Sequence, residues 1–194
     1  DLYSSGTASS GKQIGGLQSI VADAGTGTVG GIDSGTYTWW QNKVYDFSNA
    51  SVTPGPTTMI SSMNQLWAQL VRGKDMPDLI VMDNTYWGYF LGGLQTIQRI
   101  TDAGTGASGF KKWKALDYMG TPVVLDGGLG GDAPSAHVYM LNTDYLEFVT
   151  HRDRNFTPLN GKRLATNQDA FTQFILWAGN LVCSGRQFQS VMIA

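Results

Sequence analysis

The sequence predicts an α+β fold in which two helices lie within a mostly β chain. Its 194 residues are 42% hydrophobic, which suffices for one packed core or for two lobes that share one. Helical spacing of apolar residues appears in two stretches, and short β-branched or aromatic runs bounded by turn residues fill much of the remainder. Strands and helices do not alternate regularly, which disfavours a doubly wound parallel sheet.

The first predicted helix covers about residues 57–72. Its apolar residues repeat at helical spacing and form one broad stripe, which indicates core packing rather than a cofactor pocket. Pro56 stands at its entry and Thr57 or Thr58 can cap it. We expect Gly73 to end the helix.

The second predicted helix covers residues 84–100, with Asn84 or Thr85 as its cap. Two adjacent glycines weaken its middle. Between the two helices, residues 79–82 form a continuous apolar run, which predicts a strand buried on both faces.

Several further strands are predicted from β-branched and aromatic runs that end at glycine, proline or asparagine. A strand or a helical turn is compatible with residues 17–23. The first predicted strand is residues 36–47, and two strand pieces joined through 120–122 lie within 115–128. Residues 137–142 are predicted to pair with 144–151 across a turn at 142–144. The last two predicted strands are residues 173–185 and 186–194.

The charge content is low. Charged residues make up 14% of the chain, against about 25% in an average soluble domain. A subunit that hides its flanks against neighbours tolerates this shortfall, although a neutral, glycine-rich monomer remains an alternative. The net charge is −2, and the densest basic clusters, residues 111–114 and 151–154, are short. We therefore expect at most weak, non-specific contact with nucleic acid.

No membrane segment and no disulfide are expected. No apolar run approaches the roughly 20 residues that a membrane span needs. The single cysteine, Cys183, cannot form an internal disulfide and is predicted to be a small buried hydrophobe. A reducing cytosolic folding environment is consistent with this composition.

Two glycine-rich stretches approach nucleotide-binding motifs without matching them. Residues 6–13 resemble a phosphate-binding loop, but Gln13 replaces the metal-binding Ser or Thr. Residues 25–30 spell G-x-G-x-x-G, but loop and strand follow where a helix is required. Neither stretch predicts a nucleotide site.

The residues also give no support to an enzyme. The two histidines, His137 and His151, are isolated, and neither a nucleophile elbow nor a metal-binding spacing is present. We therefore predict no catalytic, cofactor or metal residues. The aromatic runs at 36–40 and 85–90 leave open a carbohydrate-binding or glycoside-acting domain, but a core or an interface is favoured for them.

Five segments in a fixed order carry a family resemblance over nearly the whole chain. They are KQIGGLQSIV at 12–21, GTVGGIDSGTYTWWQNKV at 27–44, LDYMGTPVVLDG at 116–127, YMLNTDYLEFVTHRDRNFTPL at 139–159, and residues 168–194. In this order they resemble the C-terminal part of a tailed-phage major capsid protein with the Hong Kong 97-type fold. A close variant with the same fold is an encapsulin-type shell, which packages enzymes instead of DNA.

The resemblance implies a division of the chain. Residues 15–149 would form the axial domain, whose loops meet at the centre of a pentamer or hexamer. Residues 1–14 and 150–194 would belong to the peripheral domain. Family members begin with an N-terminal arm, an extended loop and a spine helix, so we expect these elements to precede Asp1 in a longer parent protein.

The same resemblance implies a structural role. The chain would assemble with copies of itself into the icosahedral shell that encloses phage DNA, in the bacterial host cytoplasm, and would reside in the virion. A scaffold, a portal and a maturation protease are its implied further partners. Candidate subunit contacts are Trp39 and Trp40, together with Arg152, Asp153 and Arg154, which can form ion pairs between subunits or simply a solvated turn.

Overall fold

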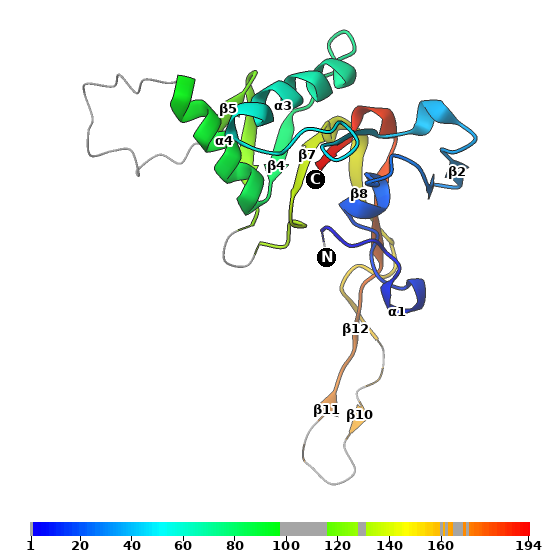
Figure 1. The fold of residues 1–194 in the computed structure, drawn as a ribbon. Coiled ribbons are helices and arrows are strands. Elements are labelled where there is room, and N and C mark those ends of the chain that lie inside the picture. The colour runs from blue at the N-terminus through cyan, green and yellow to red at the C-terminus, as the bar shows by residue number, and fades with distance from the viewer. Residues whose placement is uncertain are drawn as a thin grey trace.

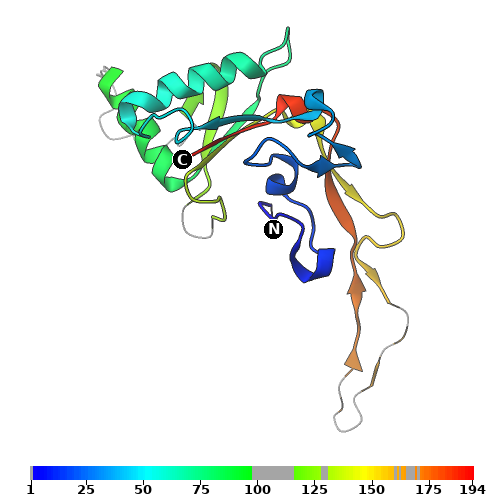
Figure 2. The ribbon, with the colours of Figure 1, turned by 45° about the vertical axis from the view of Figure 1, so that its right-hand side comes forward.

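The computed structural model describes residues 2–97, 116–127, 131–159, 161, 163–164, 169 and 171–194. The described chain forms a body built on a six-stranded sheet and a narrow arm that projects from it (Figures 1 and 2). We call residues 146–183 the arm and the rest the body. The end of the second predicted helix at 98–100 and the basic cluster at 111–114 lie outside the described residues.

The sheet of the body has the order β3-β14-β7-β4-β6-β5. Most neighbours are antiparallel, but β14 runs parallel to β3, and β4 runs parallel to β6. The strands are β3 (Lys43–Asp46), β4 (Leu79–Met82), β5 (Leu116–Tyr118), β6 (Thr121–Leu125), β7 (His137–Leu141) and β14 (Ser190–Ile193).

Two helices cover one face of this sheet. They are α3 (Pro56–Leu70) and α4 (Asn84–Ile97), and they pack against each other as well as on the sheet (Figure 2). Side chains alternate along a strand, so Ile80 and Met82 of β4 point to this face. Met140 of β7 and Met192 of β14 join them in the same core cluster. This cluster is the larger of two buried apolar layers.

The opposite face of the sheet is covered by the N-terminal segment, residues 2–34. Val81, Tyr139 and Val191 lie on this face and are buried. Leu17 and Ile20 of the short helix α2 (Leu17–Ile20) pack against them. The N-terminal segment also contains α1 (Ala8–Gly11) and the strands β1 (Thr28–Val29) and β2 (Ile32–Asp33). The central strands β4, β7 and β14 therefore have buried residues on both faces.

A fully buried arginine fastens the N-terminal segment to the body. Arg186 begins the 3-10 turn η3 (Arg186–Phe188), and none of its surface is exposed. Its Nε donates to the carbonyl of Ile20 at 2.6 Å, and its Nη1 donates to the carbonyl of Gly27 at 3.1 Å and to Ser34 Oγ at 3.0 Å. Burial lowers the pKa of its guanidinium. The hydrogen-bond partners of this buried guanidinium are backbone carbonyls and a hydroxyl, not a carboxylate.

The arm continues the central hairpin of the sheet. After β7 the chain passes through η2 (Thr143–Tyr145) into the arm, and it returns through η3 into β14, which pairs with β7. The side chain of Gln189 extends the hydrogen bonding between these two strands by one residue. Its Nε2 donates to Asn142 O, and its Oε1 accepts from Asn142 N. The rings of Tyr145 and Phe188 stack at 4.6 Å in the same joint.

Both predicted helices and the buried strand at 79–82 are confirmed, but the caps differ. The first helix begins at Pro56 after Gly55, and Thr58 Oγ1 donates to carbonyls instead of capping the helix. It ends at Leu70, ahead of Gly73. The cap of the second helix is the buried Asp83, whose carboxylate accepts from the amides of Thr85, Tyr86 and Ala136. An acid at a helix N-terminus is also favoured by the helix dipole.

Three strand predictions need correction. The predicted strand at 36–47 is a 3-10 turn, η1 (Thr38–Trp40), followed by β3. Residues 137–142 and 144–151 are both extended but do not pair, because the first belongs to the sheet and the second to the arm. A parallel crossover joins β4 to β6 with α4 between them, which the sequence did not indicate.

The predicted division of the chain at residues 149 and 150 falls inside a strand of the arm, β8 (Leu146–Thr150). Residues 150–194 supply the rest of the arm, and they also supply β14 near the middle of the sheet. The C-terminal stretch therefore contributes to both parts of the molecule.

Replacing Arg186 should strongly destabilise the chain. Arg186→Ala leaves buried carbonyls without donors and opens a cavity, so we expect a loss of about 3 kcal/mol or more in the free energy of unfolding. Arg186→Lys keeps the charge but not the fork of donors, and should lose less. Urea unfolding followed by circular dichroism measures both.

The matched control is Arg72→Ala, because Arg72 is exposed. We expect it to change the free energy of unfolding by no more than about 0.5 kcal/mol. Equal effects of Arg72→Ala and Arg186→Lys would contradict the anchoring role of Arg186.

Candidate interaction surface

The arm is one long antiparallel hairpin. At its root β8 pairs with β13 (Gly179–Cys183), with Leu146 opposite Cys183 and Thr150 opposite Gly179. Farther out, β9 (Thr157–Pro158) pairs with β12 (Ile175–Leu176), and β10 (Arg163–Leu164) pairs with β11 (Phe171–Thr172). Figure 1 shows these pairs in line, leading away from the body.

The arm exposes many large apolar side chains. A two-stranded hairpin is at best marginally stable by itself in water, and contiguous exposed apolar surface usually marks an interface. Ile175 is 66% exposed and Phe156 is 72% exposed. The exposed apolar residues of the arm are Phe148, Val149, Phe156, Leu159, Phe171, Phe174, Ile175 and Val182.

The N-terminal segment covers only the root of the arm. Leu146, Leu181 and Cys183 pack against the second core cluster. Just beyond them, Phe148 stacks on Trp177 with ring centroids 5.6 Å apart. An apolar pocket of about 220 Å³ lies at this place, lined by Leu2, Ile14, Gly15, Gly16, Phe148 and Leu181. The arm thus has a covered root and an uncovered outer part.

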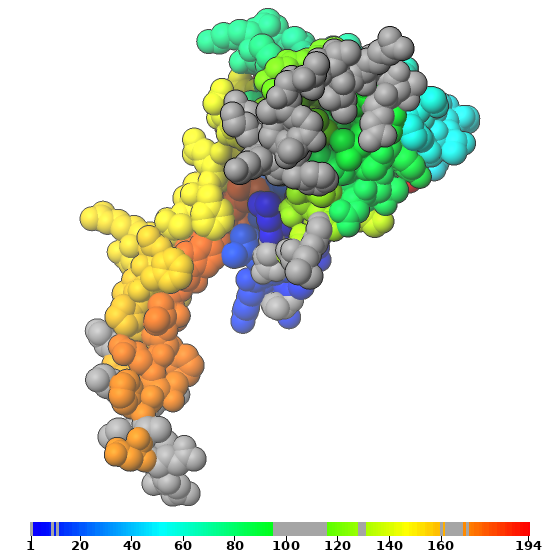
Figure 3. Space-filling model, turned by 90° about the vertical axis from the view of Figure 1, so that its left-hand side faces the viewer, coloured from blue at the N-terminus to red at the C-terminus, as the bar shows by residue number. Residues whose placement is uncertain are grey.

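A bulge stands out from the side of the arm between β8 and β9. His151 N donates to Ala178 O, and Ala178 N donates to Arg154 O, so one residue of the returning strand spans both ends of the bulge. Phe156 adopts a left-handed conformation with φ 53°, which is rare for a bulky residue. Figure 3 shows this part of the chain in yellow, projecting from the arm. We call residues 151–156 the knob.

The predicted contact residues Arg152, Asp153 and Arg154 lie in the knob and are exposed. Within the described part of the chain, the only ion pair joins His137 and Asp23, so none of these three side chains has a partner. Their place on a projecting bulge leaves both guanidinium groups available to another molecule.

The predicted contact residues Trp39 and Trp40 have different surroundings. Trp40 is 7% exposed and its Nε1 donates to Val29 O at 3.2 Å. Trp39 is 57% exposed and meets Trp40 edge to face. Tyr37 is also exposed, but its ring is tilted by 59° from that of Trp39, so the two do not form a flat platform for a sugar.

The second aromatic run, residues 85–90, belongs to the core. Tyr86, Trp87 and Phe90 lie on α4 and are buried in the larger core cluster. The structure thus confirms the preference for core packing over a sugar-binding face in this run.

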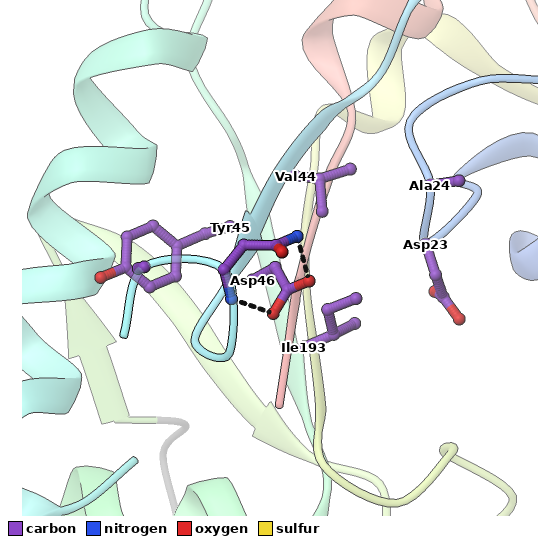
Figure 4. A pocket seen from close by; sticks show the side chains of 8 residues that line it. Asp23, Ala24, Val44, Tyr45, Asp46 and Ile193 are labelled. Atoms are coloured by element: carbon purple, nitrogen blue, oxygen red, sulfur yellow. Dashed lines mark hydrogen bonds between the residues drawn. The ribbon is translucent and has the colours of Figure 1, made fainter. Parts of the chain in front are cut away.

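An open groove of roughly 720 Å³ lies where β3 and β14 end, on the face that the N-terminal segment covers. Val44 and Ile193 form its apolar floor, and Asp23 and Asp46 lie on opposite sides of them (Figure 4). We call this the acidic groove. The small side chains of Ala24 and Ala50 also line it, which leaves it open.

The two carboxylates of the acidic groove are held in place. Asp46 accepts hydrogen bonds from the amides of Ser48 and Asn49 at 2.8 and 3.1 Å, and from Asn49 Nδ2 at 2.6 Å. Asp23 Oδ1 lies 3.2 Å from His137 Nε2 and is about half exposed. Both carboxylates therefore keep a fixed position beside the groove. The sequence alone gave no signal for it, since Asp23 and Asp46 come together only through tertiary structure.

The other sequence features lead to no chemical site. Residues 25–30 run into the hairpin of β1 and β2, whose turn glycines Gly30 and Gly31 have φ of 62° and 80°. Cys183 is half-buried, and burial raises the pKa of its thiol. Among the described residues, no group of three or more His, Cys, Asp or Glu could hold a metal ion. No described helix is long and apolar enough to cross a membrane.

Buried tyrosines give the body a predicted alkaline limit. Burial raises the pKa of Tyr118 to about 12, and it raises the pKa of Tyr3, Tyr86 and Tyr139 further. In the unfolded chain these phenols ionise near pH 10. Above about pH 10 the unfolded state therefore binds fewer protons than the folded state, and the free energy of unfolding should fall as pH rises.

This is measured by titrating tyrosinate absorbance alongside urea unfolding at each pH. In urea all eight tyrosines should ionise together. In the folded chain, Tyr3, Tyr86, Tyr118 and Tyr139 should ionise later, or only as the chain unfolds. Eight phenols titrating together near pH 10 in the folded chain would contradict the prediction.

Comparison with known proteins shows similarity to solved structures. No protein-family model matches the chain, and no curated protein matches it. A solved chain described as "Cyanophage A-1(L) capsid asymmetric unit" shares its fold, with a TM-score of 0.66 and 20% sequence identity. The match covers 99% of this chain and 63% of that chain.

Proposed function

We propose that this chain is a structural subunit of a phage capsid, corresponding to the C-terminal part of a major capsid protein with the Hong Kong 97-type fold. The observation that carries the proposal is the fold shared with a cyanophage capsid chain over 99% of the present sequence. That neighbour favours a phage shell over the encapsulin-type alternative.

The exposed surfaces support an assembling subunit. The arm presents a row of large apolar side chains to solvent. Soluble monomers rarely expose so much contiguous apolar surface. Charged residues are few, and interfaces are depleted of charge at their centres. The partners we propose are copies of the same chain, in pentamers and hexamers that close into an icosahedral shell around DNA.

The two parts of the molecule suit different places in such a shell. We propose that the body, within residues 15–149 and with β14 added, is the axial domain. The arm and residues 1–14 would belong to the peripheral domain. The predicted division at 150 is thus kept in outline, with the C-terminal strand moved to the axial side.

The apolar pocket at the root of the arm suits a longer parent protein. The present chain spans 63% of the length of the capsid chain it matches. We propose that a preceding segment of the parent, the spine helix of the family, covers Phe148 and the outer face of the arm.

The proposed role is structural, without catalysis or a cofactor. The proposed site of action is the virion, after assembly in the bacterial host cytoplasm with a scaffold, a portal and a maturation protease. Contact with packaged DNA would be weak and non-specific, since the chain carries a net charge of −2.

Electron microscopy tests the proposal directly. The complete reading frame that contains this chain should be expressed with any scaffold protein encoded beside it. We expect closed shells or separate capsomers. A product that sediments as a monomer at every concentration tested would contradict the proposal.

The two neighbouring tryptophans should separate assembly from stability. Trp39→Ala removes an exposed aromatic side chain, so we expect assembly to weaken roughly tenfold while the free energy of unfolding changes little. Trp40→Ala removes a buried ring and should lower the free energy of unfolding by about 3 kcal/mol or more. Sedimentation velocity and urea unfolding measure the two effects, and unchanged assembly of Trp39→Ala would remove Trp39 from the contacts.

A further inference from the structure

We propose that the knob of one copy docks into the acidic groove of a second copy. This inference rests on the proposed function, because it names the surfaces through which two subunits meet. The two surfaces lie on different parts of the chain, the knob on the arm and the groove on the body, so each copy can offer one while it receives the other.

The knob has the chemistry of a cationic and apolar plug. Arg152 and Arg154 are exposed, and neither guanidinium has an ion-pair partner among the described residues. Phe156 beside them is 72% exposed and is held in an unfavourable left-handed conformation. Such conformations persist where the surroundings or a function require them. Arginine and aromatic side chains are also those that dominate binding energy in protein interfaces.

The acidic groove is complementary to the knob in charge and in apolar character. Its floor, Val44 and Ile193, is apolar and half-buried, which suits an aromatic ring. Asp23 and Asp46 flank that floor. Asp46 is fixed by hydrogen bonds from the turn after β3, and Asp23 Oδ1 lies 3.2 Å from His137 Nε2. Fixed carboxylates lose little conformational freedom when a guanidinium binds, and a carboxylate can accept two parallel hydrogen bonds from it.

The edge of the sheet adds a backbone component. Lys43 N and Phe47 N donate to Gln189 O and Ile193 O of the β14 side. Because direction alternates along a strand, the backbone groups of Val44 point away from β14, toward the open edge. Val44 also lines the groove. These backbone groups can therefore hydrogen-bond with a segment of a second copy that docks in the groove.

This contact has a defined symmetry. The knob and the groove are different surfaces, so the contact is head-to-tail. Each copy in a row contacts one neighbour through its knob and the other neighbour through its groove. Head-to-tail contacts either close into rings or continue as open filaments. A contact of this type fits the rings of the proposed pentamers and hexamers.

Directed disulfide formation tests the pairing. In a Cys183→Ser background, one chain carries Asn155→Cys in the knob, which keeps both arginines, and another carries Ala50→Cys in the groove. Mixed and gently oxidised, the two should form a crosslinked dimer of unlike chains. The matched control replaces Ala50→Cys with Gln65→Cys, an exposed position of α3 on the other face of the sheet.

Charge exchange tests the recognition. Arg152→Glu with Arg154→Glu should lower the crosslinking yield at least about tenfold, and Asp23→Lys in the groove chain should restore part of it. Raising the salt concentration should weaken the unaltered pair. Arg72→Glu, a reversal at an exposed site of the body, should have no effect.

The outcomes separate this inference from the proposed function. If the chain sediments as a multimer but knob and groove do not crosslink above the control, the inference is overturned and the proposed function stands. A complete parent protein that remains a monomer at all concentrations, with any scaffold supplied, overturns both. Crosslinking that charge reversal does not change would show proximity without the recognition proposed here, and would also overturn it.

Discussion

The buried guanidinium of Arg186 is the constraint on which the rest of the architecture depends. It binds the carbonyls of Ile20 and Gly27, and it sits in the turn that leads into β14. A charge removed from water must have its donors satisfied, so the N-terminal segment cannot leave this position without a large cost. Two ends of the sequence are thereby joined, and the second face of the central strands is buried.

The central strands of the sheet are covered on both faces, whereas the arm is not. The body is closed by helices on one side and by the N-terminal segment on the other. The arm receives support only at its root, where Leu146 and Leu181 reach the second core cluster. A rigid body that carries a weakly supported, apolar extension is suited to binding other molecules through that extension.

Periodicity and composition were enough to predict the helices, the strand at 79–82 and the core position of residues 85–90. They failed where tertiary contacts decide. Asp83 caps α4 because a buried strand end places it there, and residues 137–142 pair with the C-terminal strand instead of their neighbour. Among the predicted contact residues, Trp39 and Trp40 look equivalent in sequence but face opposite ways. The acidic groove could not be predicted from the sequence, because only the folded structure brings Asp23 and Asp46 to the same place.

The continuity of the arm with β7 and β14 has a mechanical meaning. Any pull on the arm along its length enters the sheet through two adjacent strands near its middle, bordered by β4 on one side and β3 on the other. The hydrogen bonds along those borders hold both strands within the sheet, so the arm is attached to the middle of the sheet and not to an edge strand. Force on the arm therefore reaches strands that each have a hydrogen-bonded neighbour on both sides.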